Sequence, residues 1–184
     1  MKVIIFCGGK GTRLREETEF KPKTMVDIGG RPIMWFIIQR YTHYGFKDFV
    51  LPLGYRGDVI KQYFHDYTTR NSDFTINLSS GDTTVHNSGA CVDWKVTLCD
   101  TGEDTEKGGR IKRVAQHLGS GPFMATYGDG VADIDINALL AFHKKQGKLG
   151  TFTGVRMPSR FGTVSTDAKG NISSWQEKPV LNQF

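Results

Sequence analysis

Residues 2–14 read KVIIFCGGKGTRL, and this stretch carries the strongest indication of the fold. Its first part, Lys2 to Phe6, is a short β-branched and aromatic run that stops at glycines and does not continue with helical spacing. Such a run is typical of a buried strand. The glycines after it predict a turn whose backbone N–H groups a phosphate can approach, beside the partial positive charge of a following helix start. A flexible turn without a ligand is the alternative.

Strand and helix patterns alternate along the rest of the chain. Apolar residues recur at three- and four-residue steps from Ile33 to Tyr44 and over residues 59–64, which predicts helices before and after a strand at residues 49–53. We expect later strands at residues 92–99, 123–127, 151–155, 163–166 and 172–175, later helices after Gly109 and Asp135, and an antiparallel excursion within residues 71–89. This alternation predicts an α/β domain with a mixed, mainly parallel central sheet flanked by helices, whose ligands bind beyond the carboxyl ends of the strands.

Length and composition narrow the class of protein. The chain has 184 residues, within the usual range of one domain, and its 38% hydrophobic content is too high for a disordered protein. The apolar run at residues 3–7 is too short for a signal peptide or a membrane span, so we expect a cytoplasmic protein with no membrane partner. Three cysteines and five histidines form no zinc-type cluster. The net charge of +5 suits nucleic acid, small phosphorylated substrates or a solvated basic surface.

Cations accompany the glycine turn. The turn reads GGKGTRL over Gly8–Leu14, which matches neither the dinucleotide-binding fingerprint nor the P-loop pattern. Arg13 lies within it, and Lys21 and Lys23 follow on either side of Pro22. Phosphoryl chemistry needs positioned cations that neutralise anionic oxygens. The segment therefore predicts a phosphate cradle.

A second segment, TYGDG at residues 126–130, places a carboxylate where a strand is expected to end. Asp129 stands there between Gly128 and Gly130. Mg²⁺ bound to nucleotide phosphates commonly takes only one or two protein carboxylates, and water and phosphate oxygens supply the other ligands. Asp129 is therefore a candidate magnesium ligand; an aspartate in an ordinary glycine turn is the alternative.

Together these segments resemble the sugar-phosphate nucleotidyltransferase family over almost the whole chain. The family's GGxGTRL signature corresponds to Gly8–Leu14, its Pro-Lys element to Pro22 and Lys23, its YGDGV element to Tyr127–Val131 and its Glu-Lys-Pro element to residues 177–179. The middle region, WKVTLCDTG at residues 94–102 and GGRIKR at residues 108–113, is similar to the cytidylyl-transferring subgroup and less so to the thymidylyl- and uridylyl-transferring relatives.

The resemblance implies a Rossmann-like nucleotidyltransferase fold and a catalytic domain over residues 1–184. It implies transfer of a cytidylyl group from CTP to α-D-glucose 1-phosphate by in-line attack at the α-phosphorus, assisted by Mg²⁺ and by arginine and lysine, with CDP-glucose and pyrophosphate as products. It also implies a homo-oligomer at full length and a role in nucleotide-sugar biosynthesis, such as that of O-antigen lipopolysaccharide. The implied site residues are the catalytic Arg13, Lys23 and Asp129, with Asp129 as metal ligand; the nucleotide-binding Gly8, Gly9, Lys10, Gly11, Thr12, Arg13, Lys23, Thr105, Arg110 and Gly128; and Glu177 and Lys178 for the sugar phosphate.

The chain also departs from the family pattern. Lys107 stands where the subgroup usually has a threonine, and Thr24 stands where a proline is usual, which bears on the nucleotide preference. Family members continue past the position of Phe184 with a sugar-binding loop and a second metal-binding aspartate, so we expect a C-terminally truncated catalytic domain.

Three alternatives stay open: use of another nucleoside triphosphate, a non-catalytic or inactive nucleotide-sugar-binding homologue, and a nucleic-acid-binding module. The last is suggested by the charge of +5 and by Arg110, Lys112 and Arg113, but no RNA- or DNA-binding signature accompanies them. We therefore expect no nucleic-acid partner.

Overall fold

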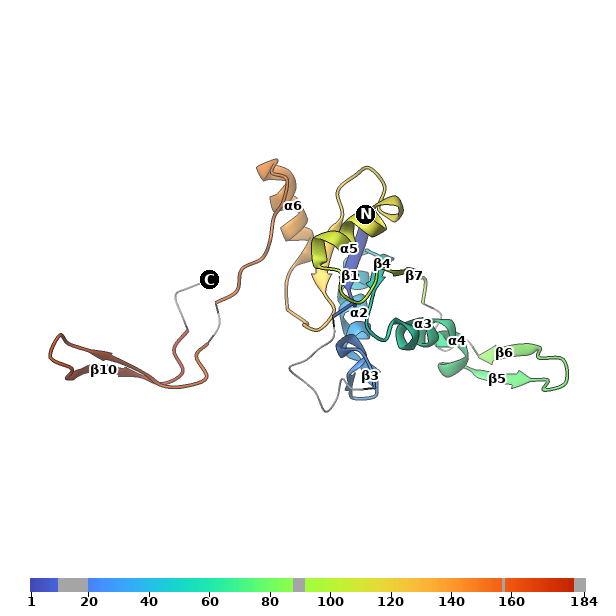
Figure 1. Ribbon diagram of the computed structural model, residues 1–184, viewed down its shortest axis with the longest axis horizontal. Helices are drawn as coiled ribbons and strands as arrows, with labels where there is room; N and C mark the ends of the chain where they lie inside the picture. Colours follow the sequence, from blue (N-terminus) through green and yellow to red (C-terminus); the bar gives the residue numbers. More distant parts are fainter. Residues whose placement is uncertain (10–19, 88–91, 157, 181–184) are drawn as a thin grey trace. The chain divides into compact units, whose positions relative to one another are not determined.

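The computed structural model describes residues 1–9, 20–87, 92–156 and 158–180, and the chain divides into two compact units (Figure 1). Unit 1 is Met1–Asp133 and unit 2 is Ile134–Phe184. That the two units act as one catalytic domain stays a prediction. The described elements of unit 1, in chain order, are β1 (Lys2–Phe6), the 3-10 turn η1 (Lys23–Met25), β2 (Asp27–Ile28), β3 (Arg31–Pro32), α2 (Ile33–His43), β4 (Asp48–Leu53), α3 (Gly57–His65), α4 (Tyr67–Arg70), β5 (Asp73–Ile76), β6 (Thr83–Asn87), β7 (Lys95–Asp100), α5 (Lys107–Val114), the 3-10 turn η2 (Ala115–His117) and β8 (Met124–Tyr127).

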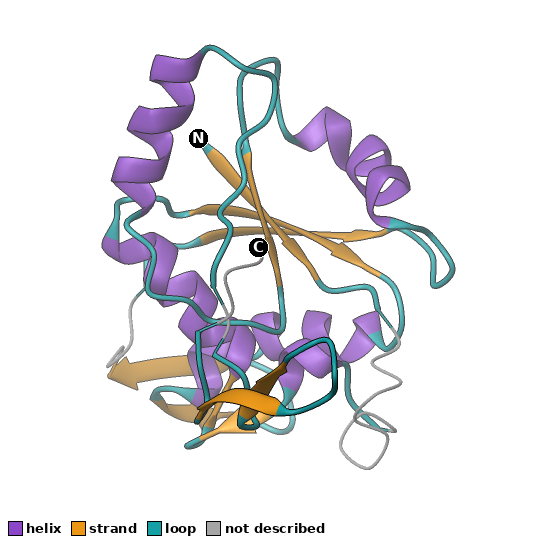
Figure 2. Ribbon diagram, turned by 90° about the vertical axis from the view of Figure 1, so that its left-hand side faces the viewer, coloured by secondary structure: helices purple, strands orange, loops and turns teal. Residues whose placement is uncertain are grey.

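The centre of unit 1 is a four-stranded sheet with the order β7-β4-β1-β8. Each of its three strand pairs is parallel, and its strands lie side by side between helices (Figure 2). Antiparallel pairing among the described residues occurs in the small sheets β2–β3, β5–β6 and β9–β10. The α/β fold with a mainly parallel central sheet that the sequence predicts is thus confirmed.

Side-chain alternation along β1 explains why helices cover both faces of the sheet. Val3 and Ile5 point to one face, where they pack in a core cluster with residues of α2 and α3. Ile4 points to the other face and packs against Val114 and Leu118 at the end of α5. All three β1 residues are fully buried, as expected of a parallel strand covered on both sides.

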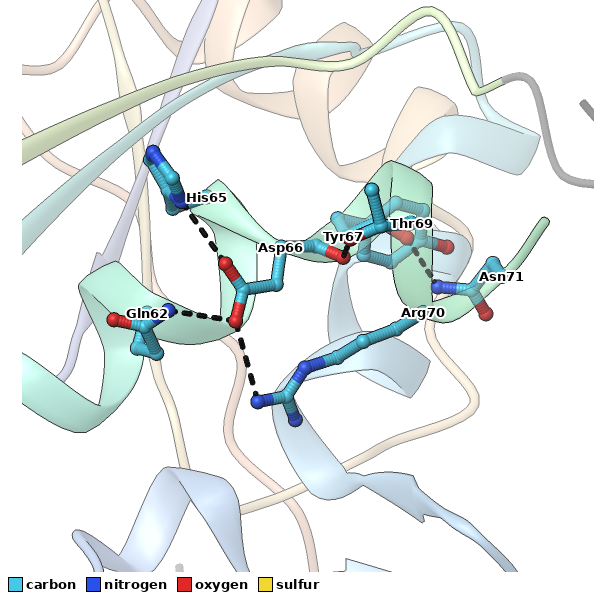
Figure 3. A network of polar contacts seen from close by, with 7 residues as sticks. All are labelled: Gln62, His65, Asp66, Tyr67, Thr69, Arg70 and Asn71. Atoms are coloured by element: carbon cyan, nitrogen blue, oxygen red, sulfur yellow. Dashed lines mark hydrogen bonds and ion pairs between the residues drawn. The ribbon is translucent and has the colours of Figure 1, made fainter. Parts of the chain in front are cut away.

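A polar network joins α3 to α4 at the edge of unit 1 (Figure 3). The Asp66 carboxylate accepts hydrogen bonds from Gln62 Nε2 at 2.6 Å and Arg70 Nη2 at 3.4 Å, and lies 2.9 Å from His65 Nδ1. These contacts lower the pKa of Asp66, with the Gln62 bond as the largest cause and the His65 bond next. Helix α4 leads into the β5–β6 hairpin, and this hairpin confirms the antiparallel excursion expected within residues 71–89.

Unit 2 contains α6 (Ile136–Gln146) and the antiparallel pair β9 (Thr163–Thr166) and β10 (Ile172–Gln176). The cap that the sequence predicts for α6 is confirmed, since Asp135 Oδ1 accepts from the backbone N–H of Ala138 at 2.9 Å.

One expected strand is absent and one expected helix start is wrong. No strand forms over residues 151–155, because the apolar alternation there finds no pairing partner among the described residues. Helix α5 begins at Lys107, so Gly108 and Gly109 lie inside its first turn and do not precede it. A Cβ on Gly109 would lie 2.9 Å from Thr105 Cγ2, so close packing at the helix start accounts for this glycine.

Candidate functional site

The carboxyl end of the central sheet contains a cavity of about 710 Å³. The chain runs from β1 to β4 and β7 on one side and then crosses to β8 on the other, so the connection order reverses between β1 and β8. Open α/β sheets bind ligands at such a reversal, because the connecting segments diverge and leave a crevice there. The residues around the cavity, all in unit 1, are Phe6, Cys7, Gly8, Gly9, Lys23, Thr24, Glu103, Asp104, Thr105, Glu106, Lys107, Arg110, Tyr127 and Asp129.

The glycine turn that the sequence predicts follows β1 and lines this cavity through Gly8 and Gly9. Gly8 is buried, and a Cβ there would lie 2.1 Å from Arg110 Cζ, so any larger residue would displace the guanidinium. No heavy atom lies within 4 Å of a Cβ on Gly9, which is exposed. The rest of the predicted cradle, Lys10, Gly11, Thr12 and Arg13, lies outside the described residues.

Arg110 extends from α5 to the ends of three strands and is only 5% exposed. Its Nη1 donates to Leu53 O at 2.9 Å and to Thr101 Oγ1 at 2.6 Å. Its Nη2 donates to Gly8 O at 3.0 Å and to Glu103 O at 2.9 Å. Burial lowers the pKa of the Arg110 guanidinium, and the nearby Arg113 acts in the same direction. Arginine still keeps its charge at neutral pH, because its pKa starts so high.

The loop before α5 forms another wall of the cavity. Thr105 Oγ1 accepts from Arg113 Nη1 at 2.6 Å, which ties the loop to the helix. Lys107 Nζ lies 5.7 Å from the centre of the Tyr127 ring, within the range of a cation–π contact. Thr105 and Lys107 therefore have defined positions on the cavity wall before any ligand binds.

Lys23 and Asp129 meet at the opposite wall, although 106 positions separate them in the chain. Lys23 Nζ lies 2.5 Å from Asp129 Oδ2, and the side chains are 32% and 35% exposed. Asp129 follows β8. Gly128 lets the chain pass close to Thr24 and Phe6 just before Asp129, since a Cβ on Gly128 would lie 2.4 Å from Thr24 Cγ2 and 2.7 Å from Phe6 O. The structure thus brings the expected cation and the expected metal ligand together as an ion pair.

Reasoning from the sequence missed several residues of this site. Thr101 is 2% exposed and both donates to Leu53 O and accepts from Arg110, and Gly54 lies against the same guanidinium. The Thr24 side chain is 4% exposed and lies beside the Cys7 thiol. Burial raises the pKa of Cys7 to about 12, so this cavity thiol is protonated and is not a nucleophile. Thr101 lies in the WKVTLCDTG region and Thr24 follows the Pro-Lys element, but no short pattern reveals the buried contacts of these residues, and none marks Gly54 or Cys7.

Two expected residues, Glu177 and Lys178, belong to unit 2 and follow β10. Glu177 Oε2 would lie 3.1 Å from a Cβ on Gly162, and Lys178 has a positive φ of 44°. Their assignment to the sugar phosphate stays a prediction.

Neither a metal cluster nor a membrane helix is present among the residues that the structure describes. No three His, Cys, Asp or Glu side chains gather into a metal-binding group. None of the described helices has the length and apolar character needed to cross a membrane.

A parallel sheet with a glycine turn and a cation-lined cavity at its order reversal is typical of α/β nucleotide-binding proteins. The chain belongs to the nucleotidyl transferase family, which matches residues 2–184. It is 48% identical over 180 residues to the glucose-1-phosphate cytidylyltransferase of Salmonella typhi, covering 97% of this chain and 69% of the relative. It is 41% identical over 178 residues to the probable glucose-1-phosphate cytidylyltransferase of Bacillus subtilis, with the same coverage of 97% and 69%.

Among solved structures, the chain is similar to HddC from Yersinia pseudotuberculosis in complex with GMP-PN. The TM-score is 0.61 at 24% identity, over 96% of this chain and 69% of the other. This likeness supports the fold alone.

Proposed function

We propose that this protein transfers a cytidylyl group from CTP to α-D-glucose 1-phosphate, forming CDP-glucose and pyrophosphate. The observation that carries the proposal is the cavity at the β1–β8 reversal, where Gly8, Gly9, Lys23 and Asp129 face one space. Glycine backbone and a lysine suit a triphosphate, and a carboxylate suits its metal. The choice of CTP and glucose 1-phosphate rests on the names of the relatives that are 48% and 41% identical.

The reaction needs little proton transfer. The second ionisation of a phosphate monoester has a pKa of about 6, so glucose 1-phosphate is already a charged nucleophile at neutral pH. Attack in line at the α-phosphorus brings two anions together and moves charge onto the leaving pyrophosphate. The work of the protein is therefore to position the reactants and to stabilise charge. We assign charge stabilisation to Lys23 and, as an expectation from the sequence, to Arg13.

The residues present fit a magnesium ion that arrives with the nucleotide. Asp129 offers one carboxylate to the cavity, and Mg²⁺ bound to phosphates needs only one or two from the protein. When bound, Mg²⁺ would screen the phosphates and stabilise charge on the leaving group. Asp129 would hold it, and Lys23, now 2.5 Å from Asp129, would then be available to phosphate oxygens.

The remaining assignments are proposals on the same footing. Thr105 and the start of α5 would contact the nucleotide, and Glu177 and Lys178 would serve the sugar phosphate, since they match the family's elements. We also propose that the protein acts in the cytoplasm, where CTP is available, and that it contributes to nucleotide-sugar biosynthesis as a homo-oligomer.

The test is turnover by the purified protein with CTP, glucose 1-phosphate and Mg²⁺. We expect CDP-glucose and pyrophosphate in equal amounts, and much slower turnover with UTP. Cytosine and uracil exchange an amino donor for a carbonyl acceptor, so a site that pairs with one leaves a polar group unpaired with the other. Equal use of CTP and UTP would reject the nucleotide assignment. Tight CTP binding without any CDP-glucose would favour a non-catalytic nucleotide binder.

A further inference from the structure

The Arg110 guanidinium has little donor capacity left for a ligand. Its four terminal N–H groups are matched by four protein oxygens: Leu53 O, Thr101 Oγ1, Gly8 O and Glu103 O. Arginine has five N–H donors in all, so only the Nε–H is left. A phosphate that took a terminal N–H from Arg110 would break one of these four hydrogen bonds, three of which are buried, and the loss of a buried hydrogen bond costs free energy.

We propose that Arg110 is a positioning residue that holds the start of the glycine turn at Gly8, and that other groups of the cavity bind the phosphates. The proposal rests on the nucleotidyl transfer proposed above, in which the backbone of this turn meets the triphosphate. It differs from the expectation drawn from the family pattern, in which Arg110 itself binds the nucleotide.

The contacts join α5 to three segments of the chain, at Gly8, at Leu53 and at the loop from Thr101 to Glu103. Nη1 connects the end of β4 at Leu53 with Thr101 beyond β7, and Nη2 connects Gly8 beyond β1 with the loop at Glu103. The planar fork of arginine can meet four acceptors at once, whereas the lysine ammonium is a single point of charge on a flexible stem. Charge alone therefore cannot replace Arg110.

Two glycines next to the guanidinium support this role. A Cβ on Gly8 would lie 2.1 Å from Arg110 Cζ, and a Cβ on Gly54 would lie 2.8 Å from Nη1. The guanidinium thus occupies the space where a side chain at either glycine position would lie. Because Gly8 has no side chain, it leaves room for the Arg110 guanidinium.

The first experiment compares Arg110→Lys, which keeps the charge, with Arg110→Met, which removes it. Lys112→Met, an exposed change on the same helix, is the matched control. We expect both Arg110 variants to weaken CTP binding by about tenfold or more, measured by calorimetry well below their unfolding temperature. In the protein without nucleotide, both should also speed amide hydrogen exchange at Tyr55 and Thr101, whose N–H groups bond to Gly8 O and Leu53 O.

Two results would overturn the proposal. If Arg110→Lys binds CTP about as well as the wild type while Arg110→Met does not, the charge acts directly on the phosphates. If both variants lose stability but keep CTP affinity, Arg110 is structural and does not position the turn. The exchange measurement needs no ligand, so it still tests the clamp if the wild type proves not to bind CTP and the proposed function fails.

A double-mutant cycle gives an independent test. Gly8→Ala places a methyl group where the guanidinium lies, so it should lower the denaturation midpoint strongly in the wild type. In an Arg110→Ala background the space is empty, and the same methyl group should cost far less. Strong non-additivity is therefore expected, because the two residues are in direct contact. Additive effects would show that Arg110 does not hold the turn at Gly8.

Discussion

Two cations line the same cavity in very different surroundings. Arg110 is 5% exposed and donates to four protein oxygens, three at the ends of β1, β4 and β7 and one in the loop before α5. Lys23, on the wall next to β8, has a side chain that is 32% exposed and pairs with Asp129 alone among the contacts described for it. A buried and fully bonded group is hard to redirect, whereas a partly exposed ion pair is weak and can exchange partners.

The difference indicates a division of roles across the cavity. The Arg110 wall gives the site its shape before a nucleotide binds, because its bonds run between protein segments. The Lys23–Asp129 wall holds opposite charges that suit a phosphate and its metal, so these groups can change partners when a ligand arrives. Catalysis by preorganised charge needs both properties.

Lys23→Met should produce the largest effect and sharpens the comparison most. We expect turnover to fall about 100-fold or more, as when one group that stabilises developing charge is removed. The free energy of unfolding should change by less than about 1 kcal/mol, since partly exposed ion pairs contribute little. Steady-state kinetics and urea titration measure the two quantities. Near-normal kcat would remove Lys23 from the mechanism.

Arg110→Met should lower the free energy of unfolding much more than Lys23→Met does. Four hydrogen bonds to protein oxygens are lost, three of them buried, so we expect the free energy of unfolding to fall by about 3 kcal/mol or more. Urea titration beside Lys112→Met, which should stay within about 0.5 kcal/mol of the wild type, measures this. A loss as small as that of Lys23→Met would break the comparison between the two walls.

A pair of glycine variants tests the packing on either side of the turn. Gly128→Ala places its Cβ 2.4 Å from Thr24 Cγ2 and 2.7 Å from the Phe6 carbonyl oxygen, whereas Gly9→Ala meets no heavy atom within 4 Å. We expect a destabilisation of about 1–3 kcal/mol for the first, as in overpacked interiors, and little change for the second. Equal unfolding midpoints for the two variants would contradict the close packing at Gly128.

Asp66 extends the comparison to carboxylates and should give the smallest effect. The bonds from Gln62 and His65 lower its pKa, so the ionised form is favoured in the folded protein. That stabilisation is present above the unfolded-state pKa, about 3.9, and is lost as the pH falls through the folded-state pKa. Asp66→Asn should therefore lower the melting temperature at pH 7 but hardly at pH 3. Equal shifts at both pH values would show that the charge of Asp66 is not involved.

Local patterns in the sequence predicted most of the fold. The β1 run, the glycines after it and the Asp135 cap each depend on neighbouring residues, so their outcome could be read from short segments. The strand expected at residues 151–155 failed because a strand also needs a partner for its backbone hydrogen bonds, and apolar alternation does not supply one. The start of α5 was misplaced because Gly108 and Gly109 look like a helix breaker, although both lie in its first turn, where Gly109 packs closely against Thr105.

The site was less predictable than the fold. Lys23 and Asp129 could be chosen from their motifs, but nothing in the sequence says that they form an ion pair. The inward orientation of Arg110 depends on oxygens at three strand ends, and Thr101 and Gly54 matter only because that guanidinium lies against them. Such many-body contacts have no signature in any short stretch of the chain.

Calorimetric titration of CTP with and without Mg²⁺, in the wild type and in Asp129→Asn, tests the central claim most directly. With Asp129 as the one proposed protein ligand, Mg²⁺ should bind weakly alone and tightly with CTP, and by linkage each should raise the affinity of the other by the same factor. After correction for metal binding to free CTP, we expect Mg²⁺ to tighten CTP binding to the wild type and this effect to disappear in Asp129→Asn, while the variant stays folded. Undiminished coupling in the variant would contradict the account, because Asp129 would then not be the carboxylate that holds the metal of the nucleotide.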